Sequence, residues 1–160
     1  MSLEQGLRKY FGDNPRRVVI VGVGNPIRGD DAVGPRIIEL LESRPIDDVL
    51  LLNAESVPES FTGKVEQLNP THVLLVDATN FHGLPGETKL ITGEQIGGQV
   101  VSTHSLPLNI FISYIEKSLG LSVLLLGIQP FSIGLGEPIS APVMIAAVSI
   151  ADILYKILSK

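Results

Sequence analysis

Two carboxylates and one imidazole stand at points of the sequence where side chains often do chemistry. Asp31 follows a glycine-rich turn, Asp77 ends an apolar run, and His104 comes directly before an amphipathic segment. Two hard oxygen ligands and one imidazole nitrogen suit a divalent transition metal that keeps open coordination positions. We therefore predict that Asp31, Asp77 and His104 form a metal-binding group.

Asp30 lies directly before Asp31, so that two acids share one turn. An Asp at a helix start caps exposed backbone N–H groups and favours the helix dipole. Two adjacent carboxylates repel each other unless positive charge lies nearby, and Arg28, Arg36 or a metal ion would supply it. We expect Asp30 to cap the helix or to assist a water molecule, and Asp31 to contact the metal.

Short apolar runs that alternate with amphipathic segments must position these side chains. The runs predict strands over residues 17–23, 49–53, 72–76, 88–91 and 122–126. The helical periodicity predicts helices over residues 2–11, 31–43, 58–68, 105–119 and 139–158. The alternation indicates an α/β fold: a single domain over residues 1–160, with a mostly parallel, twisted sheet of about five strands and helices on both faces.

The connections between the strands determine where the candidate site residues lie. Right-handed crossovers place the carboxyl ends of parallel strands on one rim of the sheet. Asp31 and Asp77 follow strands, and we expect His104 to reach the same rim from the start of a helix. We expect residues 88–91 to lie at a sheet edge, and residues 93–102, with Gly97 and Gly98 inside, to form a loop.

Composition excludes several classes of protein. The formal net charge of −5 and the lack of a basic cluster argue against nucleic acid as a partner. The chain has no cysteine, which removes disulfides, thiolate metal sites and a cysteine nucleophile. Residues 1–11 lack the apolar core of a signal peptide. We expect a cytoplasmic protein.

The apolar segment 139–158 is long enough to span a bilayer. Asp152 and Lys156 interrupt it, and its apolar residues step by three or four positions. That spacing is typical of a helix that packs on a sheet. We therefore expect no membrane insertion.

Two enzyme classes are disfavoured by missing residues. The turn Gly22-Val23-Gly24 resembles a dinucleotide-binding loop, but Ile27 occupies the position where that fingerprint needs a third glycine. The chain has no Gly-x-Ser-x-Gly elbow of a serine hydrolase. Ser102 and Ser105 flank His104 too closely in sequence to be its obvious nucleophile. Without cysteine or a serine triad, water is the favoured nucleophile.

Several ordered motifs together resemble one known family, the maturation endopeptidases of [NiFe]-hydrogenases, in particular the branch that serves hydrogenase 3-type enzymes. The similarity runs from about residue 17 into the final helix. The motifs are Gly22-Val23-Gly24-Asn25-Pro26, Gly29-Asp30-Asp31-Ala32-Val33-Gly34, Val76-Asp77-Ala78-Thr79, Thr103-His104-Ser105-Leu106-Pro107-Leu108-Asn109 and Leu126-Gly127-Ile128-Gln129-Pro130.

The resemblance implies an endopeptidase that removes a C-terminal extension from the hydrogenase large-subunit precursor after nickel insertion. It implies that Asp31, Asp77 and His104 contact nickel, which the substrate supplies, although other divalent metals can occupy such a site. Asp30 would orient the attacking water or act as general base. In a second version Asp31 and Asp77 share a proton as an acid/base dyad.

A non-enzymatic alternative also fits this resemblance: a nickel-sensing or chaperone-like module that binds the large subunit without cutting it. One departure from the family pattern follows the second strand. The family often has Asp-Gly-Gly there, whereas this chain has Asn53-Ala54-Glu55. Either Glu55 replaces the missing charge or that acid is not needed.

Overall fold

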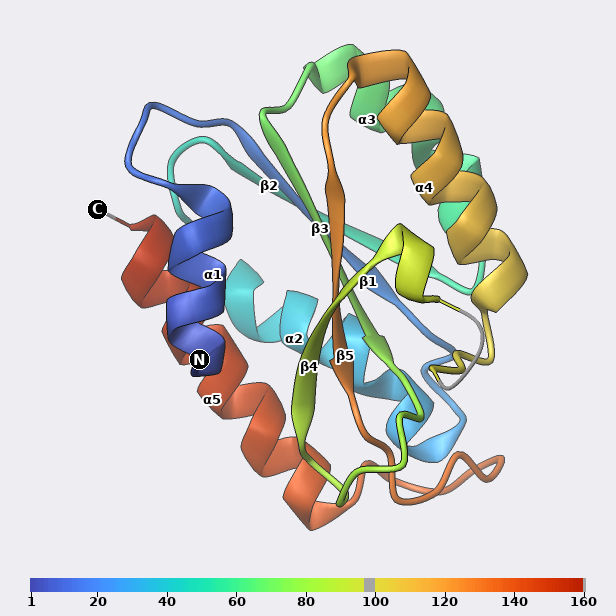
Figure 1. The fold of residues 1–160 in the computed structure, drawn as a ribbon. Coiled ribbons are helices and arrows are strands. Elements are labelled where there is room, and N and C mark those ends of the chain that lie inside the picture. Colours follow the sequence, from blue (N-terminus) through green and yellow to red (C-terminus); the bar gives the residue numbers. More distant parts are fainter. Residues whose placement is uncertain (97–99, 160) are drawn as a thin grey trace.

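A twisted sheet with strand order β2-β1-β3-β5-β4 forms the centre of the molecule (Figure 1). The computed structural model describes residues 1–96 and 100–159, and within them the strands are β1 (Val18–Val23), β2 (Val49–Glu55), β3 (His72–Ala78), β4 (Thr88–Thr92) and β5 (Val123–Ile128). β2, β1, β3 and β5 are parallel, and β4 pairs with β5 in the antiparallel sense at the edge. The predicted mostly parallel sheet and its edge strand are confirmed.

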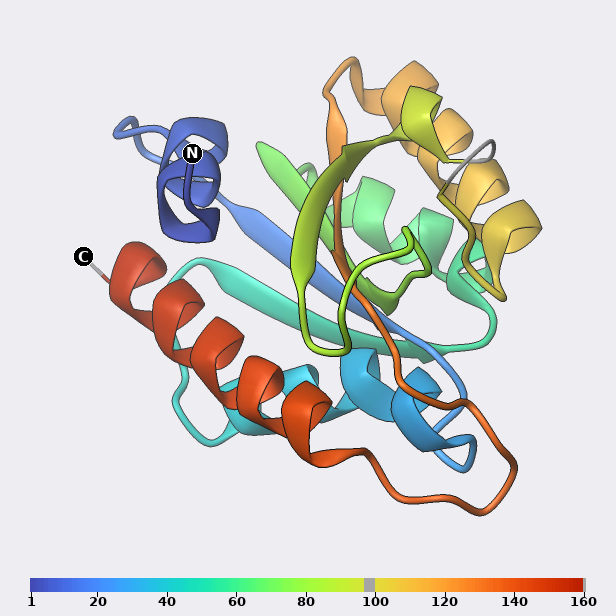
Figure 2. The same ribbon diagram turned by 60° about the horizontal axis from the view of Figure 1, so that its bottom comes forward.

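Helices cover both faces of the sheet. They are α1 (Leu3–Phe11), α2 (Val33–Glu42), α3 (Thr62–Leu68), α4 (Ser105–Leu119) and α5 (Ala141–Leu158). One apolar core joins α1, α2 and α5 to one face, and a second joins α4 and Val65 of α3 to the other. Figure 2 shows α2 and α5 on the side of the sheet opposite to α3 and α4. The single α/β domain with two helical layers agrees with the prediction.

Helix α5 is long and apolar enough to cross a membrane by length and composition. Its residues Val143, Ala147, Ile150 and Leu154 are nevertheless fully or almost fully buried in the core beneath the sheet. The stripe predicted from the sequence thus packs inside the domain.

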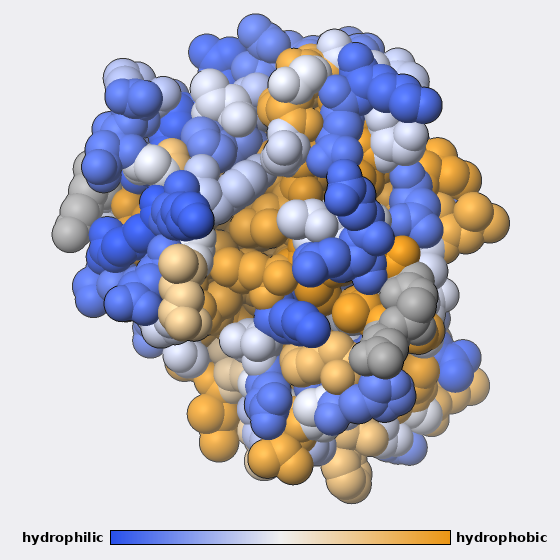
Figure 3. Space-filling view, in the orientation of Figure 1, coloured by the Kyte–Doolittle hydropathy of each residue, from blue (hydrophilic) through white to orange (hydrophobic). Residues whose placement is uncertain are grey.

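The exposed apolar side chains of α4 are visible as an orange area at the right of Figure 3.

Some predicted boundaries were wrong, and the differences lie at the functional rim. β3 continues to Ala78, so Asp77 lies inside the strand. A 3-10 turn, η1 (Gly29–Ala32), precedes α2, which begins at Val33 and not at residue 31. In the predicted loop 93–102, residues Gly93–Gln95 form another 3-10 turn, whereas Gly97 and Gly98 lie outside the described residues.

Candidate metal centre

Three elements bring the predicted ligands together at the carboxyl ends of the strands, at the lower right of Figure 1. Asp31 lies in η1, Asp77 in β3, and His104 immediately before α4. One ligand atom of each residue lies within 4.8 Å of the others. A divalent cation bound by all three would be held by three protein groups and would keep positions open for a substrate.

Two glycines let η1 and α2 approach the sheet closely enough to place Asp31. Gly24 has φ of 142°, and a Cβ atom there would overlap the carbonyl oxygen of Asp31. A Cβ on Gly34 would overlap the carbonyl oxygens of Val23 and Val76. Since these obstacles are backbone atoms, any larger residue would force α2 away from the strand ends.

Asp31 is held as a carboxylate by donors from several directions. Its Oδ2 accepts a hydrogen bond from the backbone N–H of Asn25 at 2.9 Å and lies 3.0 Å from His104 Nε2. Its Oδ1 accepts a hydrogen bond from Thr103 Oγ1 at 3.1 Å. Burial would raise the pKa of Asp31, but the hydrogen bonds from His104 and Asn25 outweigh it and lower the pKa.

Asp77 is fully buried and only half satisfied. Its Oδ2 accepts a short hydrogen bond from Ser102 Oγ, whereas Oδ1 has no hydrogen-bond partner among the described residues. Burial raises the pKa of Asp77 to about 7, against the opposing effects of Ser102 and His104. A buried carboxylate oxygen without a partner is costly. The donor set therefore fits a cation, because metal coordination would satisfy this atom.

His104 is oriented by its own backbone as well as by Asp31. Its N–H donates to Ser102 Oγ at 3.0 Å, so the hydroxyl that binds Asp77 also fixes the loop that carries His104. The hydrogen bond to Asp31 raises the pKa of the imidazole, burial opposes this, and the charge of Asp77 adds to the rise. Metal binding at Nε2 therefore requires His104 to release its proton.

The prediction that one acid of the pair caps the following helix was wrong. Asp30 is fully buried, and neither η1 nor α2 has a side-chain cap. Asp30 Oδ2 accepts hydrogen bonds from the backbone N–H groups of Phe131 and Ser132 and from Ser140 Oγ, and Oδ1 accepts one from Ser140 N–H. The structure thus does not bring Asp30 into the group of Asp31, Asp77 and His104.

The other charges considered near this pair lie elsewhere. Arg36 forms an exposed ion pair with Glu39 on α2, so of the three possible sources of positive charge it is engaged with another acid. Asn53 and Glu55 have exposed side chains at the end of β2. Glu55 reaches the site loop through its backbone, because its carbonyl oxygen accepts the N–H of Gly24 at 2.7 Å.

Sequence reasoning assigned no supporting role to three polar residues around the site, although Thr103 and Gln129 lie in the motifs quoted above. Ser102 and Thr103 donate hydrogen bonds to the two carboxylates, and their position directly before His104 was the signal that could have indicated this role. Gln129 is almost buried, and its Oε1 accepts hydrogen bonds from the N–H groups of Phe81 and Gly83. A polar amide directly after a buried strand is an ordinary loop pattern, so the sequence alone gave it no role.

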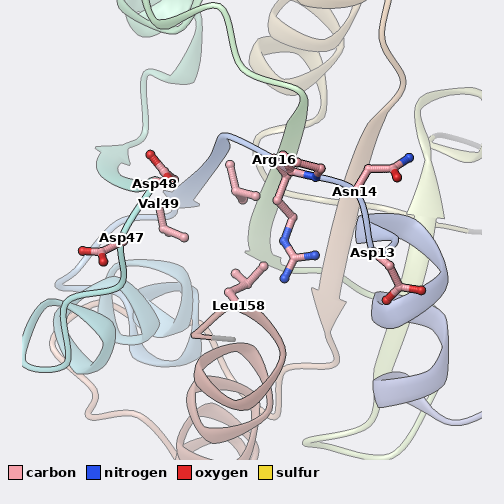
Figure 4. A pocket seen from close by; sticks show the side chains of 9 residues that line it. Asp13, Asn14, Arg16, Asp47, Asp48, Val49 and Leu158 are labelled. Carbon is pink, nitrogen blue, oxygen red and sulfur yellow. The ribbon is translucent and has the colours of Figure 1, made fainter.

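A separate hollow lies at the opposite, amino-terminal ends of the strands (Figure 4). It measures about 310 Å³ and has Asp13 on one side and Asp47 and Asp48 on the other, with Arg16 between them. The guanidinium of Arg16 donates to the carbonyl oxygens of Gly12 and Ile157. None of the proposed ligands lines this hollow, which is separate from the metal group.

Comparisons with known proteins agree with this geometry. A family model described as hydrogenase maturation protease matches residues 35–157. The hydrogenase 3 maturation protease of Escherichia coli is 34% identical over 126 residues, which cover 78% of this chain and 80% of that protein.

Solved structures show the same similarity. The crystal structure of the [NiFe] hydrogenase maturation protease HycI from Thermococcus kodakarensis is 39% identical, covers 97% of this chain and 99% of its own, and superposes with a TM-score of 0.86. The crystal structure of the hydrogenase 3 maturation protease is 32% identical, with coverage of 84% and 86% and a TM-score of 0.75.

Proposed function

The chain belongs to the hydrogenase maturation protease family, and from this we propose that it is an endopeptidase that acts on the large-subunit precursor of a [NiFe]-hydrogenase. It removes the C-terminal extension of that precursor after nickel has been inserted. The observation that carries the proposal is the group of Asp31, Asp77 and His104. It lies at the carboxyl-terminal rim of the sheet, where Asp31 lines a surface hollow, and it offers three metal ligands to an ion that a protein substrate carries.

The substrate's nickel is the feature that the protein recognises. Asp31, Asp77 and His104 bind the ion while the precursor holds it, and so place the scissile peptide bond beside the rim. Nickel supplies Lewis-acid polarisation of a carbonyl group or of a water molecule. Hydrolysis adds the hydroxyl of water to the carbonyl carbon and a proton to the leaving amine.

The protonation states of the three groups suit this recognition near neutral pH. Asp31 is ionised because its pKa is lowered, whereas Asp77, with a pKa of about 7, exchanges its proton in the neutral range. Deprotonated Asp77 supplies the second anionic ligand, and its protonated form can donate to a leaving group. Asp30 serves as a positioning residue, because both of its oxygens already accept hydrogen bonds from the loop before α5.

The same pKa values support the second version, in which no metal takes part in bond cleavage. Asp31 and Asp77 have pKa values displaced in opposite directions, as in an acid/base dyad. His104 has no separate task in that version. We favour the metal version because it uses all three residues and satisfies the unpartnered oxygen of Asp77.

Mass spectrometry of a nickel-loaded large-subunit precursor tests the peptidase activity. The precursor, incubated with the wild-type protein, is expected to lose a C-terminal peptide, and His104→Ala is expected to prevent the loss. His82→Asn is the matched control, since His82 is exposed in a loop and is not part of the metal group. A stable complex with a precursor of unchanged mass would instead favour a non-cleaving, chaperone-like module.

A further inference from the structure

Strand β2 lies at one edge of the sheet, and no other strand of the described residues pairs with its outer side. On its inner side the N–H of Val18 donates to the carbonyl oxygen of Asp48 at 2.9 Å, and the pairs with β1 continue in register as far as Gly22 and Asn53. Because the backbone groups of successive residues in a strand point to opposite sides, those of Leu51 and Asn53 point away from β1. This row of N–H and C=O groups can pair with a further strand.

The two edges of the sheet differ in how they are protected. At the other edge, β4 has Lys89 exposed in its middle, and α1 lies against Leu90 of the same strand. A lysine on an edge strand is one of the devices by which proteins prevent unwanted strand pairing. The stretch Val49–Asn53 of β2 contains no lysine, arginine or proline, and its register with β1 is regular. β2 therefore has the features of an edge that can accept another strand.

A hollow of about 260 Å³ opens beside this edge, between β2 and the end of α2. Its volume is below the range of about 300–1,000 Å³ that is typical of sites for small-molecule ligands. It suits one apolar side chain of a strand placed next to β2, since alternate side chains of such a strand point to the same face. The apolar lining consists of Leu41, Pro45, Ile46, Val49 and Leu51, and Glu42 and Arg44 complete it.

Acidic side chains lie at both ends of the same edge. Asp47 and Asp48 directly precede β2 and Glu55 ends it; all three are exposed, and none forms an ion pair with another described residue. Arg44, the basic residue in the lining of the hollow, is already paired with Asp152. A segment that lies along β2 thus meets negative charge at each end and apolar groups between them. This pattern is complementary to a segment that has Lys or Arg at both ends.

The same charges disfavour a second copy of this chain as the occupant. An antiparallel pair of β2 strands centred on Leu51 would place Leu50 opposite Leu52, and Asp47 opposite Glu55 of the other copy. The contact between the two acids would occur twice, between molecules that each carry a formal net charge of −5. Like charges directly opposite each other destabilise a strand pair. The occupant that fits this edge is therefore a different, basic chain.

We propose that the outer edge of β2 binds an extended, basic segment of a partner protein, which adds a strand to the sheet. The segment carries Lys or Arg at both ends and at least one Leu, Ile or Val side chain, which enters the hollow. Backbone hydrogen bonds to Leu51 and Asn53 supply affinity, and the hollow and the flanking acids supply specificity. The inference is independent of the proposed peptidase function, since Asp31, Asp77 and His104 do not line this hollow.

The test titrates a synthetic peptide with blocked termini, Lys-Thr-Leu-Thr-Val-Thr-Lys, into the wild-type protein at low salt. We expect saturable binding, and slower hydrogen exchange by NMR at the N–H groups of Leu51 and Asn53. A peptide with Glu in place of both lysines should bind at least about 3-fold more weakly, and the difference should shrink at high salt. N-methylation of every second residue removes the donors of one peptide edge. At least one of the two such peptides should bind at least about 10-fold more weakly.

Two variants of the protein locate the binding at β2. Leu51→Lys places a charge on the edge and in the hollow and should weaken binding at least about 10-fold. Val148→Lys is the matched control on the exposed side of α5 and should bind as the wild type does. Asp47→Asn combined with Asp48→Asn removes the negative charge from one end, and Asn tolerates the φ of 61° at position 48. This double variant should bind the Lys-ended peptide more weakly and the Glu-ended peptide more tightly.

Several results would overturn the inference. They are a lack of saturable binding of the Lys-ended peptide, unchanged affinity of both N-methylated peptides, and wild-type affinity in Leu51→Lys. Self-association of the wild type in sedimentation experiments that Leu51→Lys abolishes would also overturn it, because a second copy would then occupy the edge. If Leu51→Lys does not fold, the double variant and the N-methylated peptides decide. Cleavage of a nickel-loaded precursor is a separate measurement and decides the proposed function alone.

Discussion

His104 Nε2 lies 3.0 Å from Asp31 Oδ2, although 73 residues separate them in the sequence. Both side chains are largely buried, with exposed fractions of 12% and 3%. The pair lowers the pKa of Asp31 and raises that of His104, and both shifts favour an ion pair between the two side chains. A cation that binds these two groups replaces the proton of His104.

Removing either member of this pair should weaken metal binding. We expect His104→Ala and Asp31→Asn each to lower the affinity for Ni²⁺ by at least about 10-fold, since loss of groups that only support ligands already costs that much. Isothermal titration of the metal-free protein with Ni²⁺ measures the effect. His82→Asn serves as the control. If His104→Ala bound Ni²⁺ with the affinity of the wild type, His104 would not be a ligand of the metal.

Asp77 should make the metal-free protein less stable as the pH rises. Its pKa is about 7 in the folded state, against 3.8 for an ordinary aspartate side chain, so the folded state binds the proton more tightly. The resulting stabilisation is complete below about pH 4 and is lost as the pH rises through about 7. Urea unfolding of the wild type and of Asp77→Asn in the presence of a chelator should therefore differ with pH.

The neutral amide of Asp77→Asn cannot ionise, so this variant should not lose stability in this way as the pH rises. Between pH 5 and pH 9, chosen to lie about two units on either side of the pKa, we expect the free energy of unfolding of the wild type to fall relative to that of Asp77→Asn by a few kcal/mol. Parallel profiles for the two proteins would show that Asp77 is already ionised at pH 5.

Ser102 should act through Asp77 and His104, both of which its hydroxyl contacts. Ser102→Ala leaves a second oxygen of a buried acid without its donor, which costs about 1–3 kcal/mol of stability. Since the hydrogen bond from Ser102 lowers the pKa of Asp77, its loss should also move Ni²⁺ binding to higher pH. Titrations with Ni²⁺ between about pH 6 and pH 9, the range in which Asp77 loses its proton, measure that shift.

Ser149 provides the matched comparison for Ser102, because it is exposed on α5. Ser149→Ala should change neither the stability nor the pH dependence of Ni²⁺ binding. If Ser102→Ala lost stability but bound Ni²⁺ with the wild-type pH profile, the hydroxyl would serve packing alone.

Much of the fold followed from patterns that act locally. The β-branched runs and the three-to-four-residue periodicity gave the order of the elements, and the alternation of strands and helices gave the parallel sheet. The rim location of Asp31, Asp77 and His104 followed in turn, because parallel strands end on one side. The family resemblance agreed with the same three positions.

The errors concern contacts that depend on the path of a distant loop. Asp30 binds Phe131 and Ser140, which lie more than one hundred positions away, and no local pattern distinguishes such an acid from a helix cap. The hydrogen bonds of Gln129 to Phe81 and Gly83 were not predicted for the same reason. The end of β3 was placed too early because Asp77 is a poor strand former by type, and its burial between neighbouring strands overrides that preference.

Gly34 offers a test of how α2 positions the site. Gly34→Ala places a methyl group against the backbone of Val23 and Val76, and we expect a loss of about 1–3 kcal/mol in the free energy of unfolding. Gly63→Ala is the matched helical control: nothing lies within 4 Å of its Cβ position, and stability should rise by up to about 1 kcal/mol. Urea denaturation distinguishes the two, and equal effects would mean that α2 is free to shift.

The dependence of cleavage on the substrate's nickel tests the central claim most directly. The same large-subunit precursor is prepared with nickel and without it, each is incubated with the wild-type protein, and the mass of the product is measured over time. We predict that the nickel-loaded precursor loses its C-terminal peptide while the nickel-free precursor stays intact. Equal cleavage of both forms would contradict recognition through nickel by Asp31, Asp77 and His104, and would favour the carboxylate dyad.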